Sequence, residues 1–221
     1  MMRMLPQVSA LVPAAGAGTR LGLGPKALLA IAGKPVLRSL VDRLLRVADE
    51  VILAVPPAHL ERFASAYPDC RCIAGGGSRQ DSVQRLVQAA RCDWVLLQDA
   101  ARPFASEALL REVAMAALET GCAGAFLDPE VPVARISGGF AVEAIARDQA
   151  GVFQAPQAFS RALLLSILDQ AAAHGWCAQS TLQLALRAGV AVRSVRGEKT
   201  NIKLTTPEDW TVAQQLGELL Q

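Results

Sequence analysis

A run of small residues followed by two cations lies near the start of the chain, in the segment LVPAAGAGTRLGLGPKALL from Leu11 to Leu29. The small residues are Ala14, Ala15, Gly16, Ala17 and Gly18, and the cations are Arg20 and Lys26. Small side chains let a backbone approach a ligand closely and turn its N–H groups toward phosphate. A guanidinium binds phosphate oxygens in a bidentate way, and a lysine ammonium adds a compact charge. The segment therefore predicts a triphosphate-binding loop that stabilises charge on a reacting α-phosphate.

Two well-known phosphate loops do not fit this segment. A dinucleotide fingerprint needs G-x-G-x-x-G and an acid at the end of the second strand. Here position 21 is Leu21, and the second expected strand ends in AVPPAH, without a carboxylate. A Walker loop needs Gly-Lys followed by Ser or Thr, whereas Lys26 stands between a proline and an alanine. A solvated glycine turn with surface cations is the remaining alternative, and the spacing of Arg20 and Pro25-Lys26 argues against it.

The elements that must hold this loop alternate between short apolar strands and amphipathic helices. Strands are expected at 8–13, 50–56, 93–99, 121–127 and 190–197. Helices are expected at 35–48, 81–90, 106–120, 160–175, 180–189 and 206–220, with Ser106, Ser180 and Thr206 as N-caps. This alternation predicts an α/β fold with a Rossmann-like, mostly parallel sheet flanked by helices on both faces.

One segment interrupts the alternation. Residues 128–148 alternate apolar and polar side chains around Gly138-Gly139, which predicts a β-hairpin. We therefore expect a single domain over residues 1–221, with residues 129–148 as a protruding β-arm. Because an arm with one apolar face must pack on something, we expect it to form a homodimer.

Composition excludes several classes of protein. The chain has 221 residues, 52% of them hydrophobic and 19% charged, and a net charge of +2. This charge favours neither a nucleic-acid nor a membrane partner. No apolar run reaches the roughly 18 residues of a membrane span, and the first residues do not resemble a signal peptide, so we expect a cytoplasmic protein. The five cysteines contain no C-x-x-C pair, which predicts buried free thiols rather than a metal site.

Four further segments carry residues suited to the same site. They are GGGSRQDSV (Gly75–Val83), QDAARPF (Gln98–Phe104), APQAF (Ala155–Phe159) and GEKTNIKLTTPEDW (Gly197–Trp210). The first loop resembles the A-A-G-x-G-x-R…P-K signature of sugar-phosphate nucleotidyltransferases, and the other four resemble segments of cytidylyltransferases. Together, in this order, they resemble the 2-C-methyl-D-erythritol 4-phosphate cytidylyltransferase family of non-mevalonate isoprenoid biosynthesis.

The resemblance implies a nucleotide-diphospho-sugar transferase type of fold and a specific reaction. An oxygen of methylerythritol phosphate attacks the α-phosphorus of CTP, pyrophosphate leaves, and 4-diphosphocytidyl-2-C-methyl-D-erythritol forms. Such chemistry depends mostly on positioning and on charge stabilisation. The implied cofactor is Mg²⁺, held mainly by the CTP phosphates, with Asp99 as the candidate protein ligand.

The resemblance also implies roles for individual residues. The catalytic cations are Arg20, Lys26 and Lys203. The nucleotide-binding residues are Ala14, Ala15, Gly16, Gly18, Gly76 and Ser82. The substrate-binding residues are Asp99, Arg102, Arg147 and Ala155, of which Arg147 is expected to reach across a dimer to the substrate phosphate.

Departures from the family pattern concentrate on the side of the second substrate. An Asp-Thr pair is replaced by Pro132-Val133, a threonine by Ala155, and an acidic stretch by the residues around Ser180. The histidine that usually precedes the acid is Gln98. These changes leave two alternatives open: a cytidylyltransferase for another polyol phosphate, such as ribitol 5-phosphate, or a CTP-binding homologue with impaired catalysis.

Replacing Lys26 with alanine should lower turnover by about 100- to 1,000-fold, because it removes charge stabilisation from the transition state. Steady-state kinetics of pyrophosphate release measure the effect, and circular dichroism checks that the variant folds. An unchanged rate would exclude Lys26 from the mechanism.

Overall fold

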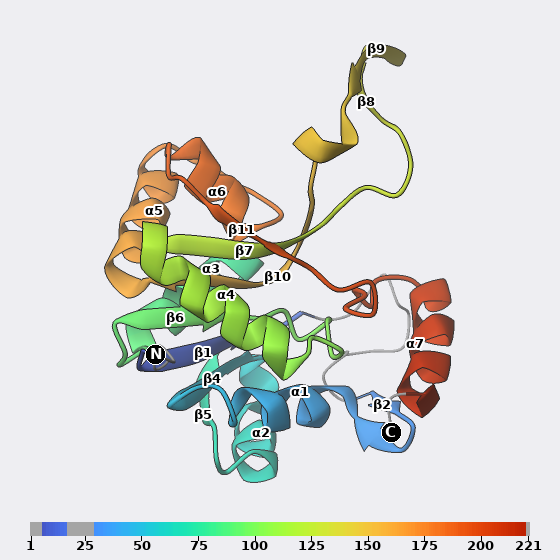
Figure 1. Cartoon of the computed structure of the whole chain (residues 1–221). Helices are drawn as coiled ribbons and strands as arrows, with labels where there is room; N and C mark the ends of the chain where they lie inside the picture. The colour runs from blue at the N-terminus through green and yellow to red at the C-terminus, as the bar shows by residue number, and fades with distance from the viewer. Residues whose placement is uncertain (1–5, 17–28, 220–221) are drawn as a thin grey trace, which may run out of the picture.

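A seven-stranded sheet forms the centre of the computed structural model, which describes residues 6–16 and 29–219 (Figure 1). Its strand order is β11-β7-β10-β6-β1-β4-β5, and β10 is antiparallel to both of its neighbours. The strands are β1 (Val8–Pro13), β4 (Glu50–Val55), β5 (Arg71–Ala74), β6 (Trp94–Leu97), β7 (Cys122–Leu127), β10 (Val152–Ser160) and β11 (Arg193–Arg196). The predicted mostly parallel α/β fold is confirmed.

Helices cover both faces of this sheet. They are α1 (Val36–Leu44), α2 (Leu60–Ala66), α3 (Arg79–Ala89), α4 (Glu107–Thr120), α5 (Arg161–Ala173) and α6 (Thr181–Arg187), whereas α7 (Pro207–Leu219) packs beside the sheet against β2 (Ala30–Ile31). Most buried apolar residues of α1 and those of α2 and α4 belong to one core cluster, and those of α3, α5 and α6 belong to a second, while Val36 of α1 belongs to a third, smaller cluster. Among the described helices, none is long and apolar enough to cross a membrane.

Alternation along the central strands assigns side chains to these two clusters. On β4, Val51, Leu53 and Val55 face the α1 and α4 side, whereas Ile52 and Ala54 face the α3 side. Successive side chains of a strand point to opposite faces, and both faces here are covered. The strands therefore read as continuous apolar runs, which is why they could be recognised in the sequence.

The expected N-caps are present. The Ser106 hydroxyl accepts from the N–H of Leu109, and the Ser180 hydroxyl accepts from the N–H of Leu182. The Thr206 hydroxyl accepts from the N–H of Asp209 at 3.3 Å. Local side-chain chemistry thus sets the start of three helices.

Strand β10 was not predicted, nor were α2 and β5. Pro156 lacks a backbone N–H, and Gln154 and Gln157 place polar groups in the strand, so the segment does not read as a central strand. The pairing of β10 with β7 shifts register between Phe153 and Gln157, and this irregularity accommodates the proline. The expectation for the cysteines was partly wrong: all five are free, but Cys122 alone is fully buried, Cys70, Cys72 and Cys92 are half-buried, and Cys177 is exposed.

The predicted hairpin is formed by β8 (Val133–Ser137) and β9 (Phe140–Ile145). Gly138 and Gly139 join them with φ values of 57° and 86°, a conformation that favours glycine. The hairpin stands away from the central sheet (Figure 1).

Candidate functional site

A cavity of about 410 Å³ lies beyond the carboxyl ends of β1 and β6. These strands are neighbours, and the next strand of the sheet lies on one flank after β1 (β4) and on the other flank after β6 (β7), so the strand order reverses at the cavity, which makes it a topological switch point. Ligands of α/β proteins bind at such points. The cavity is lined by Pro13, Ala15, Gly16, Gly76, Gly77, Ser78, Arg79, Ser82, Asp99, Ala100, Ala101 and Lys203.

The glycine loop 75–77 forms one wall because its backbone packs too tightly for a side chain. A Cβ on Gly75 would lie 2.4 Å from the Ala15 Cβ, and one on Gly76 would lie 2.3 Å from the Asp81 Cβ. The N–H of Gly76 donates to the buried Ser82 hydroxyl at 3.0 Å. Ser82 in turn donates to the carbonyl of Ser78, which caps α3. The loop is thereby fixed against the start of the helix.

A carboxylate between two cations forms the opposite wall. The Arg79 Nη2 lies 2.8 Å from one oxygen of Asp99, and the Lys203 Nζ lies 3.0 Å from the other. Arg79 also donates to the hydroxyl of the buried Thr181 at 3.2 Å. Three segments far apart in the sequence therefore meet at one carboxylate.

These ion pairs control the ionisation of Asp99, whose side chain is only 13% exposed. Burial alone would raise its pKa, but the charges and hydrogen bonds of Arg79 and Lys203 outweigh burial and hold the pKa well below its ordinary range. Asp99 is therefore an anion throughout the physiological pH range.

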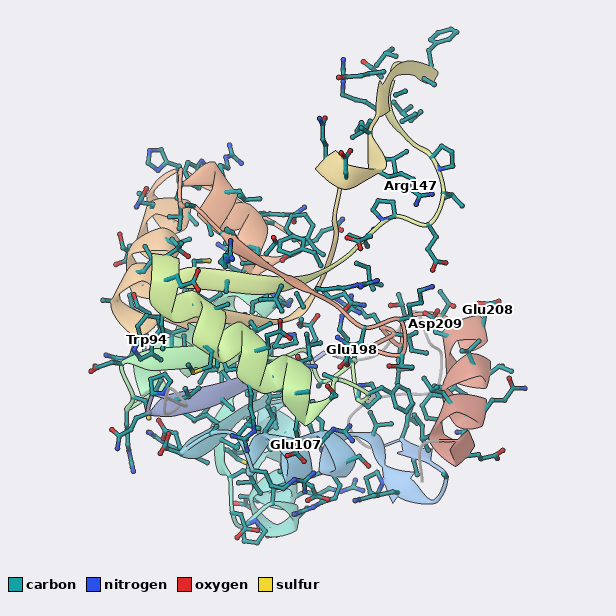
Figure 2. The ribbon with its side chains drawn as sticks, viewed as in Figure 1. Trp94, Glu107, Arg147, Glu198, Glu208 and Asp209 are labelled. Atoms are coloured by element: carbon teal, nitrogen blue, oxygen red, sulfur yellow. The ribbon has the colours of Figure 1, made fainter. Side chains whose placement is uncertain are left out.

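The segment that carries Lys203 is held by polar contacts at its backbone. The fully buried Asn201 donates from its side chain to the carbonyl of Ala155 at 2.6 Å. The Arg102 guanidinium donates to the carbonyl of Asn201 at 2.6 Å. The side-chain amide of Gln154 donates to the carbonyls of Glu198 and Asn201 (Glu198 is labelled in Figure 2). After Lys203, the N–H of Leu204 donates to the carbonyl of Ala101 at 2.8 Å, so the backbone that carries Lys203 is fixed on both sides.

The structure brings six of the predicted site residues together. They are Ala15, Gly16, Gly76, Ser82, Asp99 and Lys203. Ala14 is buried beside them, with its N–H bound to the carbonyl of Ala54. Gly18, Arg20 and Lys26 lie outside the residues that the structure describes.

Three predicted residues lie elsewhere. Arg102 and Ala155 do not line the cavity: Arg102 donates to the carbonyl of Asn201, and the carbonyl of Ala155 accepts from the side chain of Asn201. Arg147 is exposed at the end of the arm, just after β9, and donates to the carbonyl of Glu130 at 3.4 Å (Figure 2).

Arg79 was missed in the sequence analysis, although it belongs to the quoted segment GGGSRQDSV. The helix was expected to begin at Asp81, but α3 begins at Arg79, directly after the capping Ser78. Ser78 directly before this arginine is a typical N-cap. It could have predicted that the helix begins at Arg79, next to the edge of the sheet.

Two departures from the family pattern have structural roles. The buried Gln98 donates to the carbonyl of Arg102 at 3.0 Å. Ser180 caps α6, and its hydroxyl also accepts from the amide of Gln157 at 2.9 Å.

The donor set of the cavity suits a metal ion only in part. Within residues 6–16 and 29–219, no three His, Cys, Asp or Glu side chains group in a way that could hold a metal. Asp99 is the carboxylate among the lining residues. One carboxylate fits Mg²⁺ when the substrate phosphates supply most of the other oxygen ligands.

A mostly parallel sheet with a glycine-lined and cation-lined cavity at its switch point defines the class of nucleotidyltransferase-type α/β proteins. Comparisons with known proteins narrow this class. The family model for 2-C-methyl-D-erythritol 4-phosphate cytidylyltransferase matches residues 8–218. A relative of that name from Deinococcus radiodurans is 39% identical over 211 residues, which cover 96% of this chain and 90% of the relative.

Solved structures agree. The crystal structure of 2-C-methyl-D-erythritol 4-phosphate cytidylyltransferase from Thermus thermophilus is 34% identical, with a TM-score of 0.80, and the match covers 96% of this chain and 99% of that one. The 4-diphosphocytidyl-2C-methyl-D-erythritol synthase from Anaerococcus prevotii is 26% identical, with a TM-score of 0.86 and coverage of 98% and 99%. The chain therefore belongs to the 2-C-methyl-D-erythritol 4-phosphate cytidylyltransferase family of enzymes.

Replacing Arg79 with methionine should raise the pKa of Asp99 toward the ordinary carboxyl value of about 3.9, because only Lys203 then opposes the effect of burial. In the unaltered chain the stability contributed by the ion pairs is present above about pH 4 and is lost as the pH falls through the folded-state pKa. In the variant that loss should be smaller and should be complete at a higher pH, because the folded-state and unfolded-state pKa values lie closer together. Carbon-13 NMR titration of the Asp99 carboxyl measures the shift.

The matched control for this titration is Arg62→Met, which removes an exposed arginine from α2. The control should leave the Asp99 titration unchanged. An unshifted pKa in the Arg79 variant would show that Lys203 alone sets the ionisation.

Proposed function

We propose that this enzyme transfers CMP from CTP to 2-C-methyl-D-erythritol 4-phosphate, releasing pyrophosphate in non-mevalonate isoprenoid biosynthesis. The observation that carries the proposal is the convergence of the 75–77 loop, Asp99 and Lys203 on one cavity, in a chain of this family. Family membership favours methylerythritol phosphate over ribitol phosphate as the second substrate.

We assign the cytosine to the wall formed by Gly76 and Ser82. The N–H of Gly76 already donates to Ser82, so the Gly76 carbonyl is the group that we assign to accept from the amino group of the base. Uracil has a carbonyl at that place, which would repel this acceptor. The backbone of Ala15 and Gly16 lines the cavity next to Gly75, and we assign it, together with Ala14, to the sugar and phosphates.

The reaction itself needs charge stabilisation more than proton transfer. We assign Arg20, Lys26 and Lys203 to the α-phosphate, where negative charge builds as the acceptor oxygen attacks and pyrophosphate leaves. Lys203 is held by Asp99 on one side and by its fixed backbone on the other, so its ammonium is positioned before substrate binds. Such preorganisation avoids a rearrangement cost during the reaction.

The proposed Mg²⁺ supplies neutralising charge to the triphosphate when it is bound. Asp99 is the residue that would hold it, because its carboxylate is ionised and faces the cavity. Arg79 keeps that carboxylate oriented from the opposite side. We assign Arg102 to positioning, since its guanidinium contacts backbone carbonyls rather than the cavity.

We propose that the β8–β9 arm forms a homodimer. Apolar side chains are unusually exposed on and beside it, including Val131 at 67%, Ile136 at 64% and Phe140 at 76%. Exposed apolar patches of this kind mark interaction surfaces. In such a dimer, Arg147 of one protomer would contact the substrate phosphate bound to the other. We further propose a cytoplasmic location, with neither nucleic acid nor membrane as a partner.

The function is tested by incubating the purified protein with Mg²⁺, CTP and methylerythritol phosphate and following pyrophosphate release. Pyrophosphate should form with CTP and be greatly reduced with UTP or with ribitol 5-phosphate. CTP binding without pyrophosphate release from either polyol phosphate would contradict the proposal.

Replacing Ile136 and Phe140 together with glutamate should yield monomers, because the charges would be buried at the proposed interface. Sedimentation velocity measures the assembly state. Leu186→Glu is the matched control, since Leu186 is 50% exposed on α6 and lies outside the arm. A double variant that sediments as a dimer would place the interface elsewhere.

A further inference from the structure

A second cavity, of about 480 Å³, lies between the β2–β3 hairpin, α1, α7 and the segment after Arg102. The hairpin consists of β2 (Ala30–Ile31) and β3 (Lys34–Pro35). The lining residues are Ile31, Ala32, Lys34, Val36, Ser39, Asp42, Arg43, Arg46, Pro103, Phe104 and Gly217. None of these lines the proposed CTP cavity.

One side of this cavity is apolar and closely packed. Ile31 and Val36 are buried, and Phe104 packs against the cluster that they form. A Cβ on Gly217 would lie 2.2 Å from the Ile31 Cγ2, so α7 rests directly on the hairpin. This side is a preformed apolar wall.

The other side carries more positive than negative charge. Asp42 is the carboxylate among the lining residues, and two cations already bind it: the Lys34 Nζ at 2.9 Å and the Arg38 Nη2 at 2.6 Å. Arg46 forms an ion pair with Glu107. Asp42 and Glu107 are therefore already paired, and Glu198, whose charge also acts on Arg43, accepts from the N–H and the hydroxyl of Ser106.

Arg43 is the cation without such a partner. One of its Nη atoms donates to the carbonyl of Pro103, whereas its Nε is buried without a hydrogen bond. Within the described part of the chain, no carboxylate lies within the 4.0 Å that defines an ion pair with its guanidinium. Burial, followed by the charge of Arg46, lowers its pKa, although an arginine remains charged. A half-buried charge of this kind is stabilised by an anion.

We propose that this cavity binds a phosphate monoester that carries a short hydrocarbon body. The phosphate binds the guanidinium of Arg43, with Lys34 and Arg46 close by. A ligand with a doubly charged phosphate fits several cations better than a ligand with a singly charged carboxylate does. The hydrocarbon body lies against Val36 and Phe104. The volume is in the range of small-molecule sites.

The proposal is tested by isothermal titration calorimetry with n-hexyl phosphate as the probe. We expect a dissociation constant below about 1 mM. Arg43→Met should weaken binding by roughly 10- to 100-fold, the usual effect of losing hydrogen bonds to a charged group. Inorganic phosphate and n-hexanol should each bind more weakly than the probe, because each lacks one half of the ligand.

Three further variants keep the test decisive. Ser39→Phe should block binding by filling the cavity, and it removes no charge, so it also serves if the Arg43 variant is unstable. Arg62→Met, which removes an exposed arginine outside the cavity, should leave binding unchanged. Lys203→Met should also leave it unchanged, because Lys203 lines the other cavity.

Several results would overturn the proposal. Binding that is lost in the Lys203 variant but kept in the Arg43 variant would place the probe in the CTP cavity. If inorganic phosphate binds as tightly as n-hexyl phosphate, the hydrocarbon body contributes nothing to binding, and the proposed ligand class is wrong. If no heat of binding is measured with n-hexyl phosphate at about 10 mM, the cavity does not bind the proposed class of ligand.

Discussion

The Asp99 carboxylate, held between Arg79 and Lys203, is the interaction on which the site depends. It joins the end of β6, the start of α3 and the segment before α7, which are separated by 20 and 104 residues from one another along the chain. A buried carboxylate with neither cation would be strongly destabilising, so the three segments stabilise one another. The same arrangement leaves a positive edge on the cavity, where a triphosphate would bind.

A network of buried polar groups supports this interaction from behind. Arg102, Gln154 and Asn201 donate to backbone carbonyls and fix the path of the chain before Lys203, and the N–H of Leu204 donates to the carbonyl of Ala101 just after it. Networks of this kind are costly when broken, because each lost partner leaves a buried donor or acceptor unsatisfied. The side chain of a lysine is flexible, so the position of the Lys203 ammonium depends on the fixed path of the backbone that carries it.

Much of the fold could be predicted from the sequence because two-sided burial makes strands into apolar runs, and side-chain oxygens mark helix starts. Strand β10 could not be predicted, because it contains a proline, and because its two glutamines bind distant segments of the chain that no local sequence pattern reveals. The position of Lys203 followed from its motif, but the orientation of Arg102 did not. Its guanidinium contacts Asn201 across 99 residues of sequence, and either a substrate or a carbonyl would suit it equally.

The antiparallel β10 has a consequence for the order of assembly. Strands β6, β1, β4 and β5 form one block whose members all lie before residue 98, whereas β7 and β11 form a second block. No hydrogen-bonded ladder joins the blocks until β10 enters between β6 and β7. During synthesis the first block can pair while the remainder of the chain is still emerging, but β7 must wait for residues 152–160. The edge of the sheet that carries the cavity therefore begins to form early and is completed last, when the segment that carries Lys203 is added.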